Sequence, residues 1–130
     1  MEFLKIKETC LYVQDLEQAR AFYHRVLGLP VISYLEGKHL FLRAGTSVLL
    51  LFNPTDSREK TSPPAHYGGG KQHFAFEVNT GHYEDSKMEM RRKGIDIIDE
   101  VTWRSGRKSF YFNDPEGNVL EVLPDDGVWD

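Results

Sequence analysis

The stretch that decides the fold is Lys7-Glu8-Thr9-Cys10-Leu11-Tyr12-Val13, which the second half of the chain echoes as Lys71-Gln72-His73-Phe74-Ala75-Phe76-Glu77-Val78. Both copies alternate apolar and polar side chains, as a β-strand with one buried face does. Glu8 and His73 fall at the same place in the two copies. Residues 13–28 and 78–94 then both follow a helical pattern that ends in glycine, and an apolar run follows each. We therefore interpret the chain as an internal duplication.

A third polar side chain lies near the end of the second copy. Glu121 interrupts the apolar run 119–123, whereas the corresponding run of the first copy, 48–52, is apolar throughout. Three of the four equivalent strand positions therefore carry Glu, His and Glu. Carboxylates and imidazole are side chains that bind divalent metal ions.

Length and composition limit the possible classes of protein. The chain has 130 residues, which suits one domain built from two half-domains that share one sheet system. It is 40% hydrophobic and 28% charged, a composition that excludes a membrane span and argues against disorder. Its formal charge of −4 and its scattered Lys and Arg residues indicate no nucleic-acid or membrane partner. A small-molecule partner is the expectation.

The cysteine content and the first residues indicate a compartment. A single cysteine, Cys10, forms no internal disulfide, and we interpret it as a small buried apolar side chain. Residues 1–5 lack the apolar run of a secretory signal. We expect a cytoplasmic protein.

The first module, about residues 4–53, is expected to have the order βαβββ. Asp15 is suited to cap the helix that follows the first strand, and Gly28 is suited to end it. Short strands are then expected at 31–34, 40–43 and 48–52.

The second module, about residues 72–124, is expected to repeat that order. Its strand at 73–78 precedes a helix at 83–93, and strands follow at 95–98, 109–113 and 119–123. The connecting loop, 54–71, contains several prolines and a run of three glycines. It is either a lid or a plain linker.

Strand alternation predicts which side chains share a face. Apolar side chains of the second module should face its helix, which leaves His73, Tyr111 and Glu121 on the opposite face. By the same parity Glu8 lies on the helix-free face of the first module, so these groups converge if the sheets curve. Ser109 shares this parity. Trp103 lies in a basic loop that is either a substrate gate or, as we prefer, a solvated turn.

Three motifs together resemble the signatures of the vicinal oxygen chelate superfamily. The first is residues 8–29, the second is residues 73–78, and the third is residues 110–121, and they occur in the order and spacing of that superfamily. The superfamily includes glyoxalase I, extradiol dioxygenases, methylmalonyl-CoA epimerase, fosfomycin-resistance thiol transferases and metal-free bleomycin-binding proteins. The resemblance covers nearly the whole chain.

The resemblance implies an α+β fold, the glyoxalase/bleomycin resistance/dioxygenase fold, in which two βαβββ modules form a curved mixed-sheet open barrel around a divalent cation. Carried over to this sequence, the implied metal ligands are Glu8, His73 and Glu121. The fourth position falls at Leu50, so that ligand is absent. Small members of the superfamily are commonly dimers, and a homodimer is expected here.

The ligand set indicates the chemistry. Two carboxylates and one imidazole suit Mn, Ni, Co, Zn or Fe, with open positions for neighbouring oxygens of a substrate. The resemblance implies a glyoxalase-like lyase, isomerase or epimerase step, with Glu121 as both ligand and base. Tyr111 either donates to a substrate oxygen or packs against the wall. The histidines other than His73 are expected at the surface, and they are His24, His39, His66 and His82. His39 and Arg43 share one parity, however, and suit an anionic substrate if they point inward.

The main alternative is a metal-free, bleomycin-resistance-type ligand-binding protein. An extradiol dioxygenase is less favoured, because the resemblance puts Glu8 at a position where those enzymes have histidine. A fosfomycin-type thiol transferase is less favoured too, since Val128, Trp129 and Asp130 occupy the place of a basic residue in those proteins.

Overall fold

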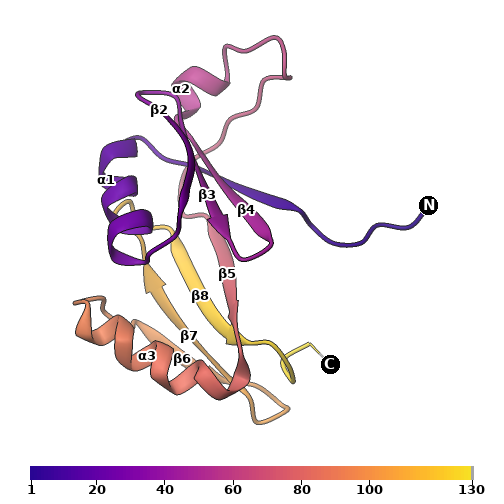
Figure 1. Ribbon diagram of the computed structural model, residues 1–130, viewed down its shortest axis with the longest axis vertical. Helices are drawn as coiled ribbons and strands as arrows, with labels where there is room; N and C mark the ends of the chain where they lie inside the picture. The colour runs from indigo at the N-terminus through magenta and orange to yellow at the C-terminus, as the bar shows by residue number, and fades with distance from the viewer. Residues whose placement is uncertain (130) are drawn as a thin grey trace. The chain divides into compact units, whose positions relative to one another are not determined.

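The structure is a computed structural model that describes residues 1–129. The chain divides into two compact units, Met1–Gly70 and Lys71–Asp130, and each is described by itself (Figure 1). Each unit holds one open four-stranded mixed sheet. Among the described residues no helix is long and apolar enough to cross a membrane.

The first unit has the sheet order β1-β4-β3-β2, with β1 parallel to β4 and the other neighbours antiparallel. Its elements in chain order are β1 (Glu8–Tyr12), α1 (Leu16–Arg20), η1 (Ala21–Val26), β2 (Val31–Leu35), β3 (His39–Ala44), β4 (Ser47–Phe52) and the short α2 (Pro54–Ser57).

The helix of the first unit begins where the sequence predicts. The Asp15 carboxylate accepts from the backbone N–H of Gln18 at 3.0 Å and caps the first turn. From Ala21 the helix widens to a π-helix that ends at Val26. Two residues later Gly28 turns the chain with a φ of +82°, a conformation that glycine adopts without strain. The buried side chains of the helix pack on the buried side chains of one sheet face, which are Leu11, Leu40, Leu42, Leu49 and Leu51.

The second unit repeats this plan with the sheet order β5-β8-β7-β6. Its elements are β5 (His73–Val78), η2 (Thr80–His82), α3 (Tyr83–Arg92), β6 (Asp99–Thr102), β7 (Lys108–Asn113) and β8 (Val119–Pro124). On the helix-facing side of the sheet, the side chains of the inner strands are fully buried, and they are Phe110, Phe112, Leu120 and Val122. Phe74 and Phe76 of the edge strand β5 share this face but are only half-buried.

The prediction of a strand at 95–98 is wrong, because this strand lies at Asp99–Thr102. Ile95 still belongs to the helix end, where its N–H donates to the Met90 carbonyl at 3.0 Å, and Gly94 turns the chain with a φ of +79°. The chain reaches the sheet at Ile98, whose N–H donates to the carbonyl of Tyr111.

The strand pairing repeats residue by residue in the two units. Glu8 opens β1 opposite Val48, and His73 opens β5 opposite Val119. Two residues further along the paired strands, Leu50 in β4 matches Glu121 in β8. The leucine identified from parity as the counterpart of Glu121 is therefore its structural equivalent.

The connection between the two sheets folds back on the first one. The Ser57 hydroxyl donates to the His66 carbonyl at 2.6 Å, and His66 Nδ1 lies 2.8 Å from the Tyr12 hydroxyl. Gly68 approaches Tyr12 so closely that an added Cβ would lie 2.9 Å from the ring. This segment is therefore fastened to the helix-free face of its own unit, at β1, and a side chain larger than hydrogen at Gly68 would displace it.

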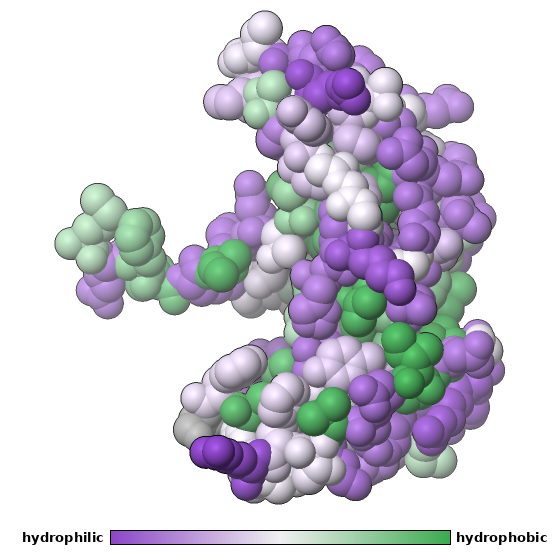
Figure 2. All heavy atoms as spheres, turned by 180° about the vertical axis from the view of Figure 1, so that it is seen from behind, coloured by the Kyte–Doolittle hydropathy of each residue, from purple (hydrophilic) through white to green (hydrophobic). Residues whose placement is uncertain are grey.

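The segment before β1 carries exposed apolar side chains, and Figure 2 shows its beginning projecting from the first unit. It joins the sheet at Lys7, whose carbonyl accepts from the N–H of Val48 at 3.1 Å. Phe3, Leu4 and Ile6 are 84%, 92% and 80% exposed. Lys5 Nζ donates to the Thr46 hydroxyl at 2.6 Å. Apolar side chains this exposed are available to another surface.

An ion pair between α3 and β6 is expected to stabilise the second unit. Lys87 Nζ donates to Glu100 Oε2 at 2.7 Å, and the Tyr83 hydroxyl donates to the same oxygen at 2.9 Å. Hydrogen bonding from Lys87 lowers the pKa of Glu100. We expect Glu100→Gln to lower the free energy of unfolding by about 1–3 kcal/mol at neutral pH, because the Lys87 ammonium is nearly buried.

The pH dependence follows from the sign of that shift. Since the folded pKa of Glu100 lies below the unfolded one, the stabilisation is present above about pH 4 and is lost as the pH falls through the folded value. Urea unfolding at several pH values measures it. Glu84→Gln is the matched control, because Glu84 bonds the same ammonium at 3.1 Å but is 65% exposed, and should cost less than about 1 kcal/mol. Equal losses in the two variants would contradict this account.

Candidate functional site

The helix-free face of the second sheet carries the polar side chains that the sequence singled out. Strand register places Ala75, Glu121 and Tyr111 in one row across β5, β8 and β7. His73 lies one row before it on β5, and Ser109 lies one row after it on β7. The structure therefore brings His73, Tyr111 and Glu121 together on one face, as predicted.

A backbone hydrogen bond fixes the imidazole of His73. Its Nδ1 lies 2.7 Å from the carbonyl oxygen of Val119, and a carbonyl can only accept, so Nδ1 carries the proton. In the neutral ring the other nitrogen, Nε2, then presents a lone pair. Metal-binding histidines are commonly oriented in this way by a carbonyl or carboxylate behind the ring.

The Nε2 lone pair faces a carboxylate. His73 Nε2 lies 3.3 Å from Glu121 Oε1, and the Glu121 side chain is only 8% exposed. An imidazole lone pair and a carboxylate oxygen repel one another at this distance unless a proton or a cation lies between them. The pair therefore fits two occupants, a second ring proton that makes an ion pair or a divalent cation held by both groups.

Tyr111 is the direct neighbour of Glu121 on the adjacent strand. Its ring is stacked against the imidazole ring of His73, with 6.3 Å between the ring centres. Burial raises the pKa of Tyr111, the nearby Ser109 hydroxyl lowers it, and the nearby Glu121 carboxylate raises it further. The phenol therefore stays protonated at neutral pH and can donate a hydrogen bond.

Glu8 occupies the equivalent position on the first unit. It is the first residue of β1, it is exposed, and no hydrogen bond or ion pair joins its carboxylate to the described residues of its own unit. Cys10 and Tyr12 follow it on the same face, where the Cys10 thiol lies 3.7 Å from the Tyr12 hydroxyl. Burial and contact with Cys10 raise the pKa of Tyr12 to about 12.

The structure assembles only part of the predicted ligand set. His73 and Glu121 lie in hydrogen-bonding range, whereas Glu8 belongs to the other unit. Within residues 1–129 no group of three or more His, Cys, Asp or Glu side chains is gathered closely enough to hold a metal ion. The set of Glu8, His73 and Glu121 as metal ligands therefore stays a prediction.

The expectation that His39 is a surface residue is wrong. His39 lies on β3 and is 9% exposed, with its ring stacked on Phe41 at 3.9 Å between centres. Its Nε2 lies 2.9 Å from the Ser33 hydroxyl, and burial lowers the pKa of the ring. Strand parity, which placed His39 on the helix-free face, was the better guide.

Two residues near the site had only weak sequence signals. Ser109 is fully buried, and its hydroxyl accepts a hydrogen bond of 3.0 Å from the indole nitrogen of Trp103. Parity placed Ser109 on the correct face but gave no partner for it. Trp103 lies beside the hairpin turn, where no strand or helix period applies, and its preferred interpretation as part of a solvated turn did not indicate this bond.

Two four-stranded units of the order βαβββ, with a histidine and a carboxylate on the helix-free face, define a class of small duplicated α+β proteins. The family model "Glyoxalase/Bleomycin resistance protein/Dioxygenase superfamily" matches residues 5–122. The chain belongs to this superfamily.

The names of the individual relatives describe different activities. The structure is similar to that of a lactoylglutathione lyase from Agrobacterium tumefaciens, with 32% identity, a TM-score of 0.91 and 96% of each chain covered. The sequence is 27% identical to the glutathione transferase FosA of Serratia marcescens, over 86% of this chain and 74% of that protein. It is 29% identical to the uncharacterized protein YwkD of Bacillus subtilis, over 90% of this chain and 94% of that one.

Proposed function

We propose that this protein is a divalent-metal-dependent enzyme that acts on a small molecule by moving a proton next to a carbonyl, as a lyase, isomerase or epimerase. The observation that carries the proposal is the facing pair of His73 Nε2 and Glu121 Oε1 at 3.3 Å. Glu8 would complete the ligand set. The bound ion, which we expect to be Mn, Ni, Co, Zn or Fe, would act as a Lewis acid that stabilises charge developing on the substrate oxygen.

The chain's own residues have separate roles in this proposal. Glu121 accepts the proton from the carbon next to the carbonyl and returns it to that carbon or its neighbour, so no external acid is consumed. Its burial limits competition by water at the carboxylate. Because Leu50 stands at the equivalent position of the first unit, Glu121 is the one base of this pair of sites.

The alternatives predict different behaviour of the same residues. In a metal-free binding protein, His73 and Glu121 would form an ordinary ion pair, and no reaction would depend on added metal. Thiol transfer has support from the similarity to the glutathione transferase FosA. The name of the lactoylglutathione lyase likewise suggests a glutathione-derived substrate. Both thiol-dependent reactions are therefore included in the test.

Metal-dependent proton exchange tests the proposal. Protein freed of metal and then reloaded with Mn²⁺, Ni²⁺ or Zn²⁺ is incubated in deuterium oxide with α-hydroxy ketones, 2-methyl thioesters and the methylglyoxal–glutathione adduct. We expect metal-dependent deuterium incorporation next to the carbonyl in at least one of these. Glutathione transfer to fosfomycin without such exchange would instead establish the transferase. Tight binding of a ligand with an affinity that does not depend on the metal would instead support the metal-free binding protein.

We also propose a cytoplasmic homodimer, whose interface would cover the exposed apolar side chains of residues 1–6. Light scattering should then give a mass near twice the 15.0 kDa of one chain. A mass of one chain at micromolar concentration would exclude the stable dimer.

A further inference from the structure

The turn between β7 and β8 is held together by two buried side chains, those of Asp114 and Asn118. Asp114 Oδ1 accepts from the backbone N–H groups of Glu116 and Asn118, each at 2.9 Å. Asp114 Oδ2 lies 2.8 Å from Asn118 Nδ2. Since a carboxylate accepts and does not donate, the NH₂ group of Asn118 must face Asp114. The amide oxygen of Asn118 is therefore directed the other way.

That amide oxygen holds the residue that precedes β5. Asn118 Oδ1 accepts from the backbone N–H of Gln72 and from Gln72 Nε2, each at 3.1 Å. The Gln72 carbonyl in turn accepts from the N–H of Val119 at 2.8 Å. Both backbone polar groups of Gln72 are thus bonded to two consecutive residues of the other segment.

The position held in this way lies directly before His73, the first residue of β5. β5 is an edge strand of its sheet, and the chain before it is the run Gly68-Gly69-Gly70, which restricts the backbone little. The start of such a strand opens easily unless other groups hold it. The His73 ring is half exposed and bonds the Val119 carbonyl at 2.7 Å, so its place depends on how these two segments are joined.

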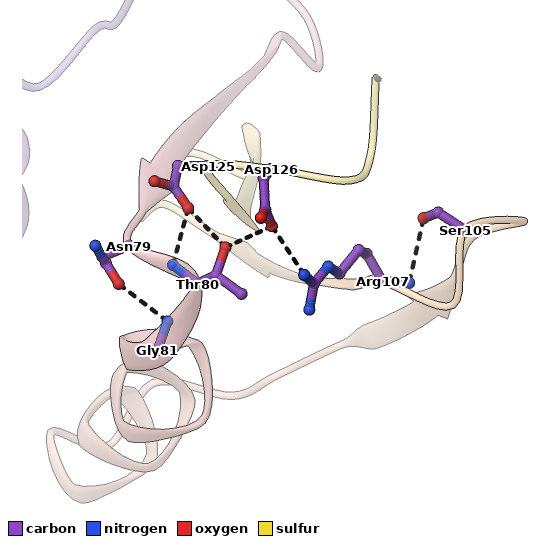
Figure 3. Close-up of polar contacts among 7 residues, drawn as sticks. All are labelled: Asn79, Thr80, Gly81, Ser105, Arg107, Asp125 and Asp126. Atoms are coloured by element: carbon purple, nitrogen blue, oxygen red, sulfur yellow. Dashed lines mark hydrogen bonds and ion pairs between the residues drawn. The ribbon is translucent and has the colours of Figure 1, made fainter.

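The opposite end of the same strand pair is joined by a different side chain (Figure 3). Asp125 directly follows β8, and its Oδ1 accepts from the backbone N–H of Thr80 at 3.0 Å and lies 2.6 Å from the Thr80 hydroxyl oxygen. Asp125 is exposed, whereas Asn118 is buried. The pair of β5 and β8 is therefore joined at both ends, and the Asn118 end is the one next to His73.

The first unit has other residues at these places. Its register puts Lys7 at the position of Gln72 and Ser47 at the position of Asn118. The N–H of Val48 still donates to the Lys7 carbonyl at 3.1 Å, as the matching groups do in the second unit. The backbone bond is thus common to both units, and the asparagine is particular to the unit whose first strand opens with histidine.

We propose that Asn118 is a positioning residue that fixes the start of β5 and thereby keeps the imidazole of His73 in front of Glu121. Asp114 takes part by orienting the amide group of Asn118. The proposal deepens the proposed function and rests on it for the bound metal, because His73 and Glu121 are the facing pair of that site. Asn118 acts through Gln72 and not on the substrate.

NMR of the metal-free protein tests the positioning itself. Asn118→Ser is the first variant, because the first unit carries serine at this place and its single hydroxyl lacks the length to join Gln72 to Asp114. We expect the Gln72 amide proton to exchange with solvent about 10-fold faster. The three-bond couplings across the Cα–Cβ bond of His73 should report one rotamer in wild type and an average of rotamers in the variant.

An exchange of the two turn residues tests the bond rather than the residue type. Asn118→Asp alone brings two carboxylates together where Asp114 accepted a bond, and it should free the His73 rotamer as Asn118→Ser does. Adding Asp114→Asn restores the same bond with donor and acceptor reversed, at the wild-type net charge. We expect the double variant to restore both the single rotamer and the slow exchange.

Mn²⁺ binding then tests the consequence for the site. Loss of a group that orients a ligand typically costs about 10- to 100-fold in metal affinity, and Asn118→Ser should show a loss of this size. Asp125→Ala is the matched control, since it breaks the far end of the same strand pair (Figure 3). It should change neither the Mn²⁺ affinity nor the His73 rotamer.

The outcomes separate this proposal from the proposed function. A single His73 rotamer in Asn118→Ser, or rotamer averaging of the same size in Asp125→Ala, would show that Asn118 does not position His73. Equal Mn²⁺ affinity in wild type and Asn118→Ser would overturn the proposal as well. If wild type binds no Mn²⁺ while the rotamer responds as expected, the proposed function fails and the positioning role stands.

Discussion

Replacing His73 by alanine is expected to lower the affinity for a divalent ion by at least about 10- to 100-fold, because loss of a ligand should cost no less than loss of the group behind it. His73 is half exposed, so its removal should leave the fold intact. The measurement is metal content by elemental analysis after dialysis against a fixed free Mn²⁺ or Zn²⁺ concentration. Wild type should hold about one ion per chain under the same conditions.

The chain offers a closely matched control for this substitution. His24 is also an exposed histidine whose Nδ1 lies 2.8 Å from a backbone carbonyl, that of Leu29. It has no carboxylate facing its other nitrogen among the ion pairs of the described residues. His24→Ala should therefore retain the metal. Equal metal content in the two variants would show that His73 is not a ligand.

Glu121→Gln should have the largest effect on catalysis. Glutamine keeps the size of the side chain and one oxygen, so the metal should be retained in part, but a carboxamide cannot accept the substrate proton. We expect turnover, or deuterium exchange where that is the assay, to fall by about 10²- to 10⁴-fold, which is the typical contribution of a general base.

Glu77→Gln is the control for Glu121→Gln. Glu77 lies on the same helix-free face, opposite Leu123, but it is exposed and one row beyond Glu121. Its removal changes the net charge by the same amount and should leave turnover near the wild-type value. Undiminished turnover in Glu121→Gln would remove Glu121 from the role of base, even if the metal were still bound.

The strands and their facing were predictable because they depend on a local period of two. Leu11 and Leu120 are buried on the helix side, and Glu8, His73 and Glu121 lie on the other side. The match between Leu50 and Glu121 followed from the same alternation. Helix ends were predictable too, since Asp15 and glycines supply the groups that helix termini need.

Features that depend on contacts between distant segments were not predictable. The link of His66 to Tyr12 joins residues 54 positions apart, and no period of the sequence records it. The bond between Trp103 and Ser109 crosses a turn whose shape follows from the hairpin. The strand at 99–102 was displaced in the prediction because the helix end extends through Ile95.

The two units also differ at matching positions, which bears on the roles of their helix-free faces. Where the second unit has Tyr111 beside Glu121, the first has Phe41 beside Leu50. Phe41 stacks on His39, and Phe52 lies 5.4 Å from Phe41 between ring centres. The pairing of a carboxylate with a phenol is therefore particular to the second unit, and the same positions of the first unit are apolar.

Anomalous diffraction at the manganese absorption edge, from crystals grown with Mn²⁺, tests the metal centre most directly. The account predicts one strong peak bound by His73 Nε2, a Glu121 oxygen and a Glu8 oxygen, at about 2.0–2.2 Å each, with Glu8 supplied by the same chain or by a second copy. A peak bound by other residues, or no peak at saturating Mn²⁺, would contradict it.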